Sequence, residues 1–343
     1  MRLLQAMAGR RQGGAERFFA RLAVAFECAG VEQQVLIRVG AACARWLEEG
    51  GIRPVALPFG GALDAVSARR FRREVESFRP DVVLTWMNRA SIFCPRPAGF
   101  VHVGRLGGYY NLKYYRRCQH LIANTRDIVE YVRGHGWVKP VHYLPNFARA
   151  APAPAVARGE FDTPEGAPLL LALGRLHRNK GFDVLIEALK SVPGAYLWLA
   201  GSGSIAGDLR RLAAALGVLD RVRFLGWRDD VGALHAAADV LVCPSRHEPL
   251  GNVVVEAWAH GSPVVAAAAT GPAALIEDGV SGLSVAVDDA DGLATALRRV
   301  IGETGLAARL AVGGREAYAA EFTESIVVGH YLSFLDQISR EVT

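Results

Sequence analysis

Two glutamates, Glu248 and Glu256, stand eight positions apart, one in an expected loop and one on the helix that follows. Leu250, Gly251 and Asn252 lie between them and open this helix, whose free backbone N–H groups and positive dipole end favour an anion. Because carboxylates repel a phosphate, we expect the two glutamates to accept hydrogen bonds from hydroxyls of a sugar and a ribose. The combination suggests a nucleotide-sugar pocket, although glutamates at this spacing are also common as solvated charges on helices.

A buried strand and a helix must position this pair. The apolar run 238–243 is closed by Pro244 and Ser245, the pattern of a buried strand that enters a turn. An amphipathic helix is expected over 253–260. The two glutamates are therefore predicted to lie where a strand is followed by a helix.

Strand and helix patterns alternate along the whole chain, which is typical of stacked βαβ units with parallel sheets. In the first half, strands are expected at 2–7, 34–39, 53–57, 81–86, 100–103, 120–123 and 141–144, and helices at 15–28 and 125–135. In the second half, strands are expected at 169–173, 195–200, 222–225, 239–242, 263–267 and 283–285. An Ala- and Pro-rich segment between the two series predicts a linker. No repeat of about twenty to fifty residues is present, which argues against a solenoid.

The composition is that of a globular protein large enough for two domains. Of the 343 residues, 51% are hydrophobic and 21% are charged, and the formal net charge is +5. No apolar run reaches about eighteen residues, so no membrane-spanning helix is expected. The five cysteines form no Cys-x-x-Cys pair and the histidines lack metal-ligand spacing, so we expect reduced thiols, a cytoplasmic protein and no metal. The mild positive charge fits nucleic acid, an anionic membrane or a phosphorylated substrate.

The run 244–266 reads Pro-Ser-Arg-His-Glu-Pro-Leu-Gly-Asn-Val-Val-Val-Glu-Ala-Trp-Ala-His-Gly-Ser-Pro-Val-Val-Ala and resembles the signature of the retaining glycosyltransferases of family 4. The resemblance extends more loosely over nearly the entire chain. It implies the GT-B fold, an α/β architecture of two Rossmann-like, doubly wound parallel-sheet domains that face each other across a cleft. The domains implied are an acceptor-binding domain at 1–150, a linker at 151–166 and a donor-binding domain at 167–322. A C-terminal helix at 323–343 is expected to pack back on the first domain.

A cationic loop that contains Arg175 and Lys180 follows the first strand of the second domain. Lys180 stands before an expected helix at 182–189, where the helix dipole disfavours a cation unless an anion is bound. Arg175 can make a two-pronged contact with the same anion. The two cations suit a diphosphate leaving group, and by themselves they also fit a solvated loop. The resemblance favours a diphosphate, because Gly-Arg-Leu followed by Lys-Gly is the pattern these enzymes use for it.

Two glycine-rich turns have the composition of phosphate-binding loops. Gly13 and Gly14 precede the first helix, and the resemblance implies that their loop contacts the donor diphosphate. Gly203 belongs to the run 201–207, where the last glycine comes one place too late for a dinucleotide fingerprint. A nicotinamide-dependent reductase is therefore a weak alternative. The resemblance places Gly203 near the nucleotide, and a plain turn fits equally well.

The segment 100–117 combines tyrosines, cations and two adjacent glycines behind an expected strand. Tyrosine and arginine suit sugar rings and anionic groups, so Arg105, Tyr109, Tyr110 and Lys113 are candidates for binding the acceptor. An amphipathic helix with tyrosines in the core is the structural alternative. No nucleic-acid module is visible, so no nucleic-acid partner is expected.

The resemblance implies a transfer that needs no metal or other cofactor beyond the nucleotide-sugar donor. Glu256 would hold the ribose, Glu248 the sugar hydroxyls, and Arg175 and Lys180 the charge on the departing diphosphate. Family members often place a histidine at the end of the strand near residue 103, beside the transferred sugar. Either His102 or Arg105 is the candidate for that position.

A saccharide or a lipid-linked sugar is the expected acceptor, as in the synthesis of lipopolysaccharide or another cell-surface glycan. Four arginines at 69–73 could touch an anionic membrane, which would make the protein peripheral, although such a charge run is usually a solvated face. Many family members carry a glutamate where Ala274 stands. Its loss leaves open a protein that binds nucleotide sugars without catalysis.

Overall fold

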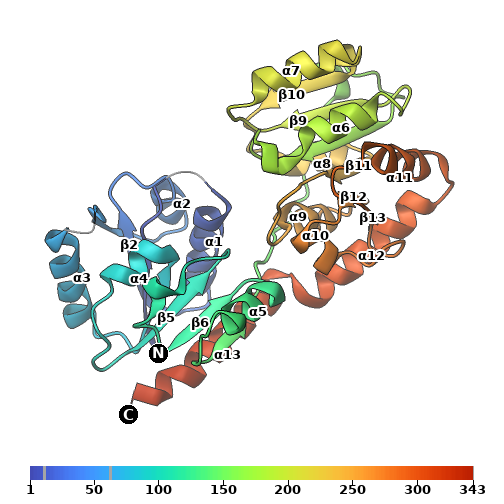
Figure 1. The fold of residues 1–343 in the computed structure, drawn as a ribbon. Coiled ribbons are helices and arrows are strands. Elements are labelled where there is room, and N and C mark those ends of the chain that lie inside the picture. The colour runs from blue at the N-terminus through green and yellow to red at the C-terminus, as the bar shows by residue number, and fades with distance from the viewer. Residues whose placement is uncertain (11–12, 62–63, 343) are drawn as a thin grey trace. The chain divides into compact units, whose positions relative to one another are not determined.

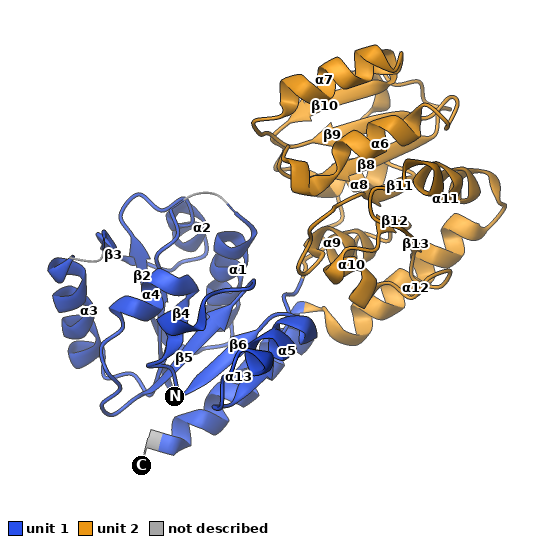
Figure 2. Cartoon of the chain, in the orientation of Figure 1, with its two compact units in different colours: residues 1–147, 324–343 blue, residues 148–323 orange. Residues whose placement is uncertain are grey.

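The computed structural model describes residues 1–10, 13–61 and 64–342. The chain divides into two compact units, which we call unit 1 (residues 1–147 and 324–343) and unit 2 (residues 148–323) (Figure 2). Each unit is built around one parallel β-sheet, of seven strands in unit 1 and six in unit 2 (Figure 1). The predicted class of two parallel-sheet α/β domains is confirmed.

Unit 1 has three layers, with helices on both faces of its sheet. The strand order is β3-β2-β1-β4-β5-β6-β7, and the strands are β1 (Arg2–Met7), β2 (Glu32–Arg38), β3 (Val55–Leu57), β4 (Val82–Trp86), β5 (Val101–Leu106), β6 (His120–Ala123) and β7 (Val141–Tyr143). The helices are α1 (Gly14–Cys28), α2 (Ala44–Glu49), α3 (Ala65–Phe78), α4 (Met87–Phe93), α5 (Arg126–Gly134) and α13 (Glu324–Ser339). Helices α1, α2 and α13 share one hydrophobic core with the sheet, whereas α3, α4 and α5 pack on its other face.

Unit 2 repeats this design. Its strand order is β10-β9-β8-β11-β12-β13, and the strands are β8 (Leu169–Leu173), β9 (Tyr196–Ala200), β10 (Val222–Gly226), β11 (Val240–Cys243), β12 (Val264–Ala267) and β13 (Leu283–Val285). The helices are α6 (Phe182–Leu189), α7 (Ala206–Ala215), α8 (Val231–Ala237), α9 (Asn252–Ala259), α10 (Thr270–Leu275), α11 (Ala290–Gly302) and α12 (Leu306–Glu321). One face of the sheet packs on α6, α7 and α11, and the other face packs on α8 and α9.

Local sequence explains why these elements begin and end where they do. All five residues of β4 are buried, because both faces of a parallel sheet are covered by helices. The side chain of Asp64 caps α3 by accepting a hydrogen bond from the Ser67 N–H at 2.9 Å. Helix α3 stops at Arg79, which has a left-handed backbone (φ 48°) and precedes Pro80. In the described part of the chain, no helix is both long and apolar enough to cross a bilayer.

Three segments differ from the sequence prediction or add to it. Strand β5 continues to Leu106 and so includes Arg105, which was expected behind the strand. Much of the expected linker packs on unit 2, because the Arg158 guanidinium donates to the Ala237 carbonyl and the Asp239 carboxylate. Helix α13 belongs to unit 1, where Tyr331 is completely buried in the core. Thr343, the last residue of the predicted helix, lies outside the described residues.

Candidate functional site

The candidate donor site lies at the topological switch point of the sheet in unit 2. From β8 the chain adds β9 and β10 on one side, and it then returns to place β11 on the other side of β8. Open α/β sheets bind ligands at the carboxyl ends of the strands that flank such a point. The loop of Arg175 and Lys180 follows β8, and the loop of Glu248 follows β11. The fold thus brings together two motifs that are far apart in the sequence.

Lys180 and Glu248 form an ion pair at this point, with the lysine Nζ in contact with the Glu248 carboxylate. The Lys180 side chain is 23% exposed and that of Glu248 is 11% exposed. Partial burial strengthens the interaction, because it is screened less than a surface pair. An ammonium group has three donors, so Lys180 can hold the carboxylate and still donate to a phosphate oxygen.

Arg246 holds together the loop that follows β8 and the loop that follows β11. The sequence analysis did not predict this role. Its guanidinium donates to both carboxylate oxygens of Asp183, at 2.8 and 2.7 Å, and also contacts Asp288. Burial acts to raise the pKa of Asp183, but the hydrogen bonds and charge of Arg246 outweigh it and lower that pKa. The Asn179 carbonyl accepts the N–H groups of Arg246 and His247, at 2.8 and 3.1 Å. The quoted family run contains Arg246, but nothing local in the sequence indicates its distant partners.

Glycines let the same loops pack backbone against backbone. Gly181 has φ 63°, and a Cβ there would lie 2.0 Å from the Pro244 carbonyl oxygen. A Cβ on Gly203 would lie 2.1 Å from the Leu176 carbonyl oxygen. Gly203, predicted to lie near the nucleotide, is therefore already required by loop packing.

The remaining predicted donor residues lie around the start of α9. Gly251 has φ 77° and caps the helix, and the neighbouring Leu250 is buried. Asn252 is the first helical residue, and Glu256 follows one turn later, half-buried. Their contact with a donor stays a prediction.

Arg175 and Ala274 complete the description of this site. Arg175 is exposed, and its guanidinium pairs with none of the residues that the structure describes. Ala274 is exposed on α10, whose second residue, Gly271, donates its N–H to the Glu248 carbonyl at 2.8 Å. Helix α10 thus borders the Glu248 loop directly.

In unit 1, the loop before α1 holds a carboxylate. Gly13 is the N-cap of α1 and Gly14 is its first residue. Cβ atoms on Gly9 and Gly13 would lie 2.3 and 2.6 Å from the carboxylate oxygens of Glu16, which is buried. The glycines therefore make room for Glu16. The predicted contact of this loop with a diphosphate stays a prediction.

His102, predicted to lie beside the transferred sugar, is part of β5. Its side chain is fully buried, with Nε2 at 2.9 Å from the Thr85 hydroxyl and 3.6 Å from the Cys118 thiol. Its backbone N–H and carbonyl are both bonded to Gln119. Burial lowers the pKa of His102 to about 3, so the ring is neutral at pH 7. The ring Nδ1 has no hydrogen-bond partner among the described residues. The role of His102 beside the transferred sugar stays a prediction, which the complete burial of the ring disfavours.

Arg105 is also enclosed by protein, at 2% exposure. Its Nε donates to the Tyr331 hydroxyl at 3.0 Å, Nη2 donates to Asn146, and the guanidinium lies over the rings of Trp86 and Phe18. The alternation of side chains along β5 points His102 and Arg105 to opposite faces of the sheet. The prediction that Arg105 contacts a substrate is inconsistent with this burial.

The other predicted acceptor residues lie nearer the surface. Tyr109 is 36% exposed and donates its hydroxyl to Asp127. Tyr110 is half-buried and stacks on Tyr115 with ring centroids 6.4 Å apart. Lys113 is exposed and lies over the ring of Tyr114. Their contact with an acceptor stays a prediction.

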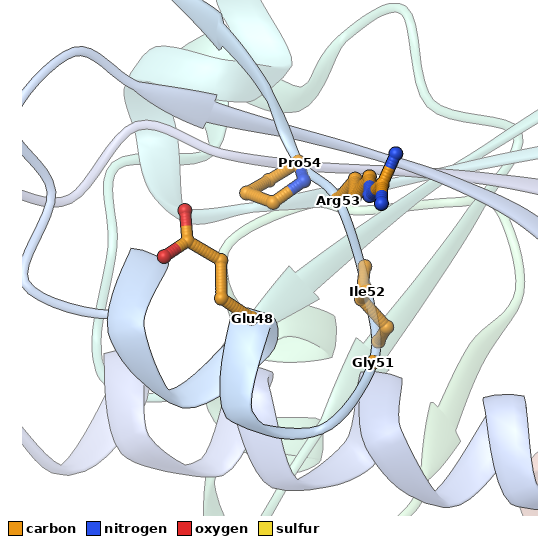
Figure 3. Close-up of a pocket in the computed structure, with 5 residues that line it drawn as sticks. All are labelled: Glu48, Gly51, Ile52, Arg53 and Pro54. Carbon is orange, nitrogen blue, oxygen red and sulfur yellow. The ribbon is translucent and has the colours of Figure 1, made fainter.

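A separate hollow is lined by Glu48, Gly51, Ile52, Arg53 and Pro54 (Figure 3). It lies at the amino end of β3, at the edge of the sheet opposite to the carboxyl ends of the strands. None of the predicted site residues lines it.

Known proteins resemble the chain in both sequence and fold. The model of the family "Glycosyl transferases group 1" matches residues 167–303. Two proteins of Rhizobium meliloti, the lipopolysaccharide core biosynthesis glycosyltransferases LpsE and LpsD, are 40% and 39% identical to the chain, and each alignment covers 95% of the chain and 96% of the relative. The crystal structure of Anabaena HepE with UDP and glucose aligns with a TM-score of 0.85 at 22% identity, over 98% of this chain and 100% of that one. The chain is therefore a glycosyltransferase of group 1 with the GT-B fold.

Proposed function

We propose that the chain transfers a sugar with retention from a nucleotide-diphosphate sugar to a saccharide or lipid-linked acceptor in the synthesis of the lipopolysaccharide core. The names of LpsE and LpsD support the pathway, since the alignments with them cover 95% of the chain. The complex of HepE with UDP and glucose supports a nucleotide-sugar donor.

The ion pair of Lys180 and Glu248 at the switch point is the observation that carries this proposal. We assign Glu248 to the hydroxyls of the transferred sugar and Lys180 to the donor diphosphate. In this arrangement the lysine holds the carboxylate in place and stabilises the charge that develops on the leaving group. Exposed Arg175 completes the cationic set with a two-pronged contact to the same diphosphate.

Glu256 and the start of α9 bind the rest of the donor in this proposal. The half-buried Glu256 accepts hydrogen bonds from the ribose hydroxyls. The N–H groups of Gly251 and Asn252 face the diphosphate at the positive end of the helix dipole. As the bond to the anomeric carbon breaks, the electron pair goes to the leaving phosphate oxygen, which accepts the proton of the attacking acceptor hydroxyl.

A Lys180→Ala variant tests this assignment. Removing the cation should lower kcat about a hundredfold to a thousandfold, the size of effect seen when one donor to a developing anion is lost. The measurement is acceptor-dependent release of the nucleoside diphosphate, preceded by a thermal-shift screen of UDP-, GDP- and ADP-sugars. Lys190→Ala, which removes an exposed lysine just after α6, is the matched control and should keep full activity. Wild-type turnover by a folded Lys180→Ala protein at saturating donor would contradict the role of the cation.

We propose in addition that α3 lies against an anionic membrane surface. Its side chains Arg69, Arg70, Arg72 and Arg73 are exposed, while Phe71 between them is buried in the core of unit 1. Each such cation contributes about 1 kcal/mol near an anionic bilayer. Replacing all four arginines by Gln should abolish pelleting with phosphatidylglycerol vesicles at low salt. Equal pelleting with neutral vesicles would contradict an electrostatic contact.

A further inference from the structure

Three arginines come together at the carboxyl edge of the sheet in unit 1. Arg10 follows β1, Arg38 is the last residue of β2, and Arg89 lies in the first turn of α4, directly after β4. The strands β2, β1 and β4 are neighbours in the sheet, and the switch point of this sheet lies between β1 and β4. We call these three residues the arginine cluster.

Two hydrogen bonds to the backbone place Arg10 and Arg89 on opposite sides of Arg38. The Arg10 carbonyl accepts the Ala42 N–H at 3.3 Å, so Arg10 lies over the loop that follows β2. The Nη1 of Arg89 donates to the Phe59 carbonyl at 3.0 Å, which places that guanidinium at the loop after β3. Since β2 pairs with β1 on one side and β3 on the other, Arg38 lies between the two. Partial burial and the charges of Arg89 and Arg10 together lower the pKa of Arg38.

No carboxylate among the described residues pairs with the cluster. None of the three arginines forms an ion pair with any residue that the structure describes, whereas Arg246 in unit 2 is bound by two aspartates. Grouping like charges is unfavourable unless an anion lies among them. The planar guanidinium group is suited to phosphates and carboxylates, to which it donates two parallel hydrogen bonds. The cluster therefore has the charge and position of an anion site at the edge where open α/β sheets bind ligands.

We propose that Arg10, Arg38 and Arg89 bind an acidic group, a phosphate or a carboxylate, of the acceptor saccharide. This inference rests on the proposed function, which assigns the donor diphosphate to the cations of unit 2. The proposal assigns the recognition of an anionic acceptor to the arginine cluster and not to the segment 100–117, where the sequence predicted it. There Arg105 is buried, and Arg117 donates to the carbonyls of Ile92 and Cys94.

Binding of three monosaccharide probes to the full chain tests the cluster. Mannose 6-phosphate carries a phosphate, galacturonate carries a carboxylate, and mannose is the neutral reference. We expect at least one acidic probe to bind more tightly than mannose by calorimetry, and the probe that binds identifies the acidic group. In Arg38→Gln and Arg89→Gln its Kd should rise about tenfold or more, because each substitution removes hydrogen bonds to a charged group. The matched control is Arg53→Gln, an exposed arginine at the amino end of β3, which should leave the Kd unchanged.

Three outcomes would overturn the proposal. The first is equal binding of mannose and both acidic probes, and the second is an unchanged Kd in Arg38→Gln. The third is a loss of pelleting with phosphatidylglycerol vesicles in the two variants while acid-sugar binding persists, which would assign the cluster to a lipid surface.

A thermal-shift titration with the nucleotide sugars, run on the same proteins, separates this inference from the proposed function. Both variants should bind the donor as the wild type does. If the chain bound acid sugars but no nucleotide sugar, the proposed function would be contradicted and the proposal for the arginine cluster would still be supported. A chain that bound the donor but no acid sugar would contradict only the cluster.

Discussion

The carboxyl edges of the two sheets use positive charge in opposite ways. In unit 2, Lys180 is paired with Glu248 and Arg246 with Asp183. In unit 1, the arginine cluster has no carboxylate partner among the described residues. Paired charges give a rigid site whose geometry exists before a ligand arrives, whereas an unpaired cluster is stabilised only when an anion binds. In the two proposals, unit 2 therefore binds its ligand in a pre-organised site, and unit 1 selects its ligand by charge.

Loop packing in unit 2 should be the feature most sensitive to substitution. In Gly181→Ala the new Cβ would meet the Pro244 carbonyl oxygen at a residue with positive φ. We expect a loss of about 3 kcal/mol in the free energy of unfolding together with loss of donor binding. Urea unfolding and a thermal-shift titration measure the two effects. Gly217→Ala is the control, because Gly217 has φ 68° with nothing within 4 Å of its Cβ position, and about 1 kcal/mol is expected there.

Unit 1 should be weakened next most strongly by removing its buried arginine. Arg105→Leu leaves the Tyr331 hydroxyl and the Asn146 side-chain oxygen without the donors they now have. We expect a loss of about 2 kcal/mol, with faster hydrogen exchange in α13, since the hydrogen bond between Arg105 and Tyr331 joins this helix to β5. Arg116→Leu, at an exposed site in the same unit, should change stability by less than about 0.5 kcal/mol. Normal stability with lost transfer in Arg105→Leu would instead restore a direct role in substrate binding.

The smallest effect is expected at the Arg246 contact. A lysine cannot make the two-pronged contact with Asp183, so Arg246→Lys should lose about 1 kcal/mol and raise hydrogen exchange at 174–181 and 244–248. Arg211→Lys, in an exposed pair with Asp208, should have no measurable effect.

The contact between Arg246 and Asp183 should also respond to acid. The pKa of Asp183 is lower in the folded chain than its usual 3.8. Its pairing therefore contributes stability above pH 3.8, and that contribution is lost as the pH falls through the folded pKa.

The acid response also distinguishes the two units. Local exchange at the Arg246 loops should rise as the pH falls through the folded pKa of Asp183 in the wild type. This rise should be smaller in Arg246→Lys, which keeps the charge but loses the two-pronged contact. Exchange at Gly40–Ala42, beside the arginine cluster, should not follow it, because no carboxylate pairs with those arginines in the described structure. A parallel rise in both units would remove the contrast between paired and unpaired charge.

Local sequence was enough to predict the alternation of strands and helices, because that pattern follows from the spacing of apolar residues. It also determined the donor motif, in which Glu248, Gly251 and Glu256 are close neighbours along the chain. The α/β class and the group 1 family follow from these local features.

Which charges are paired, buried or exposed depends on the tertiary structure. Arg105 and Arg175 are the same residue type beside similar strands, yet one is enclosed by Tyr331 from 226 residues away and the other is exposed. The order of strands in each sheet brings Lys180 into contact with Glu248 and places the three arginines of unit 1 near one another. Such contacts depend on long-range packing and burial, and no window of neighbouring residues contains that information.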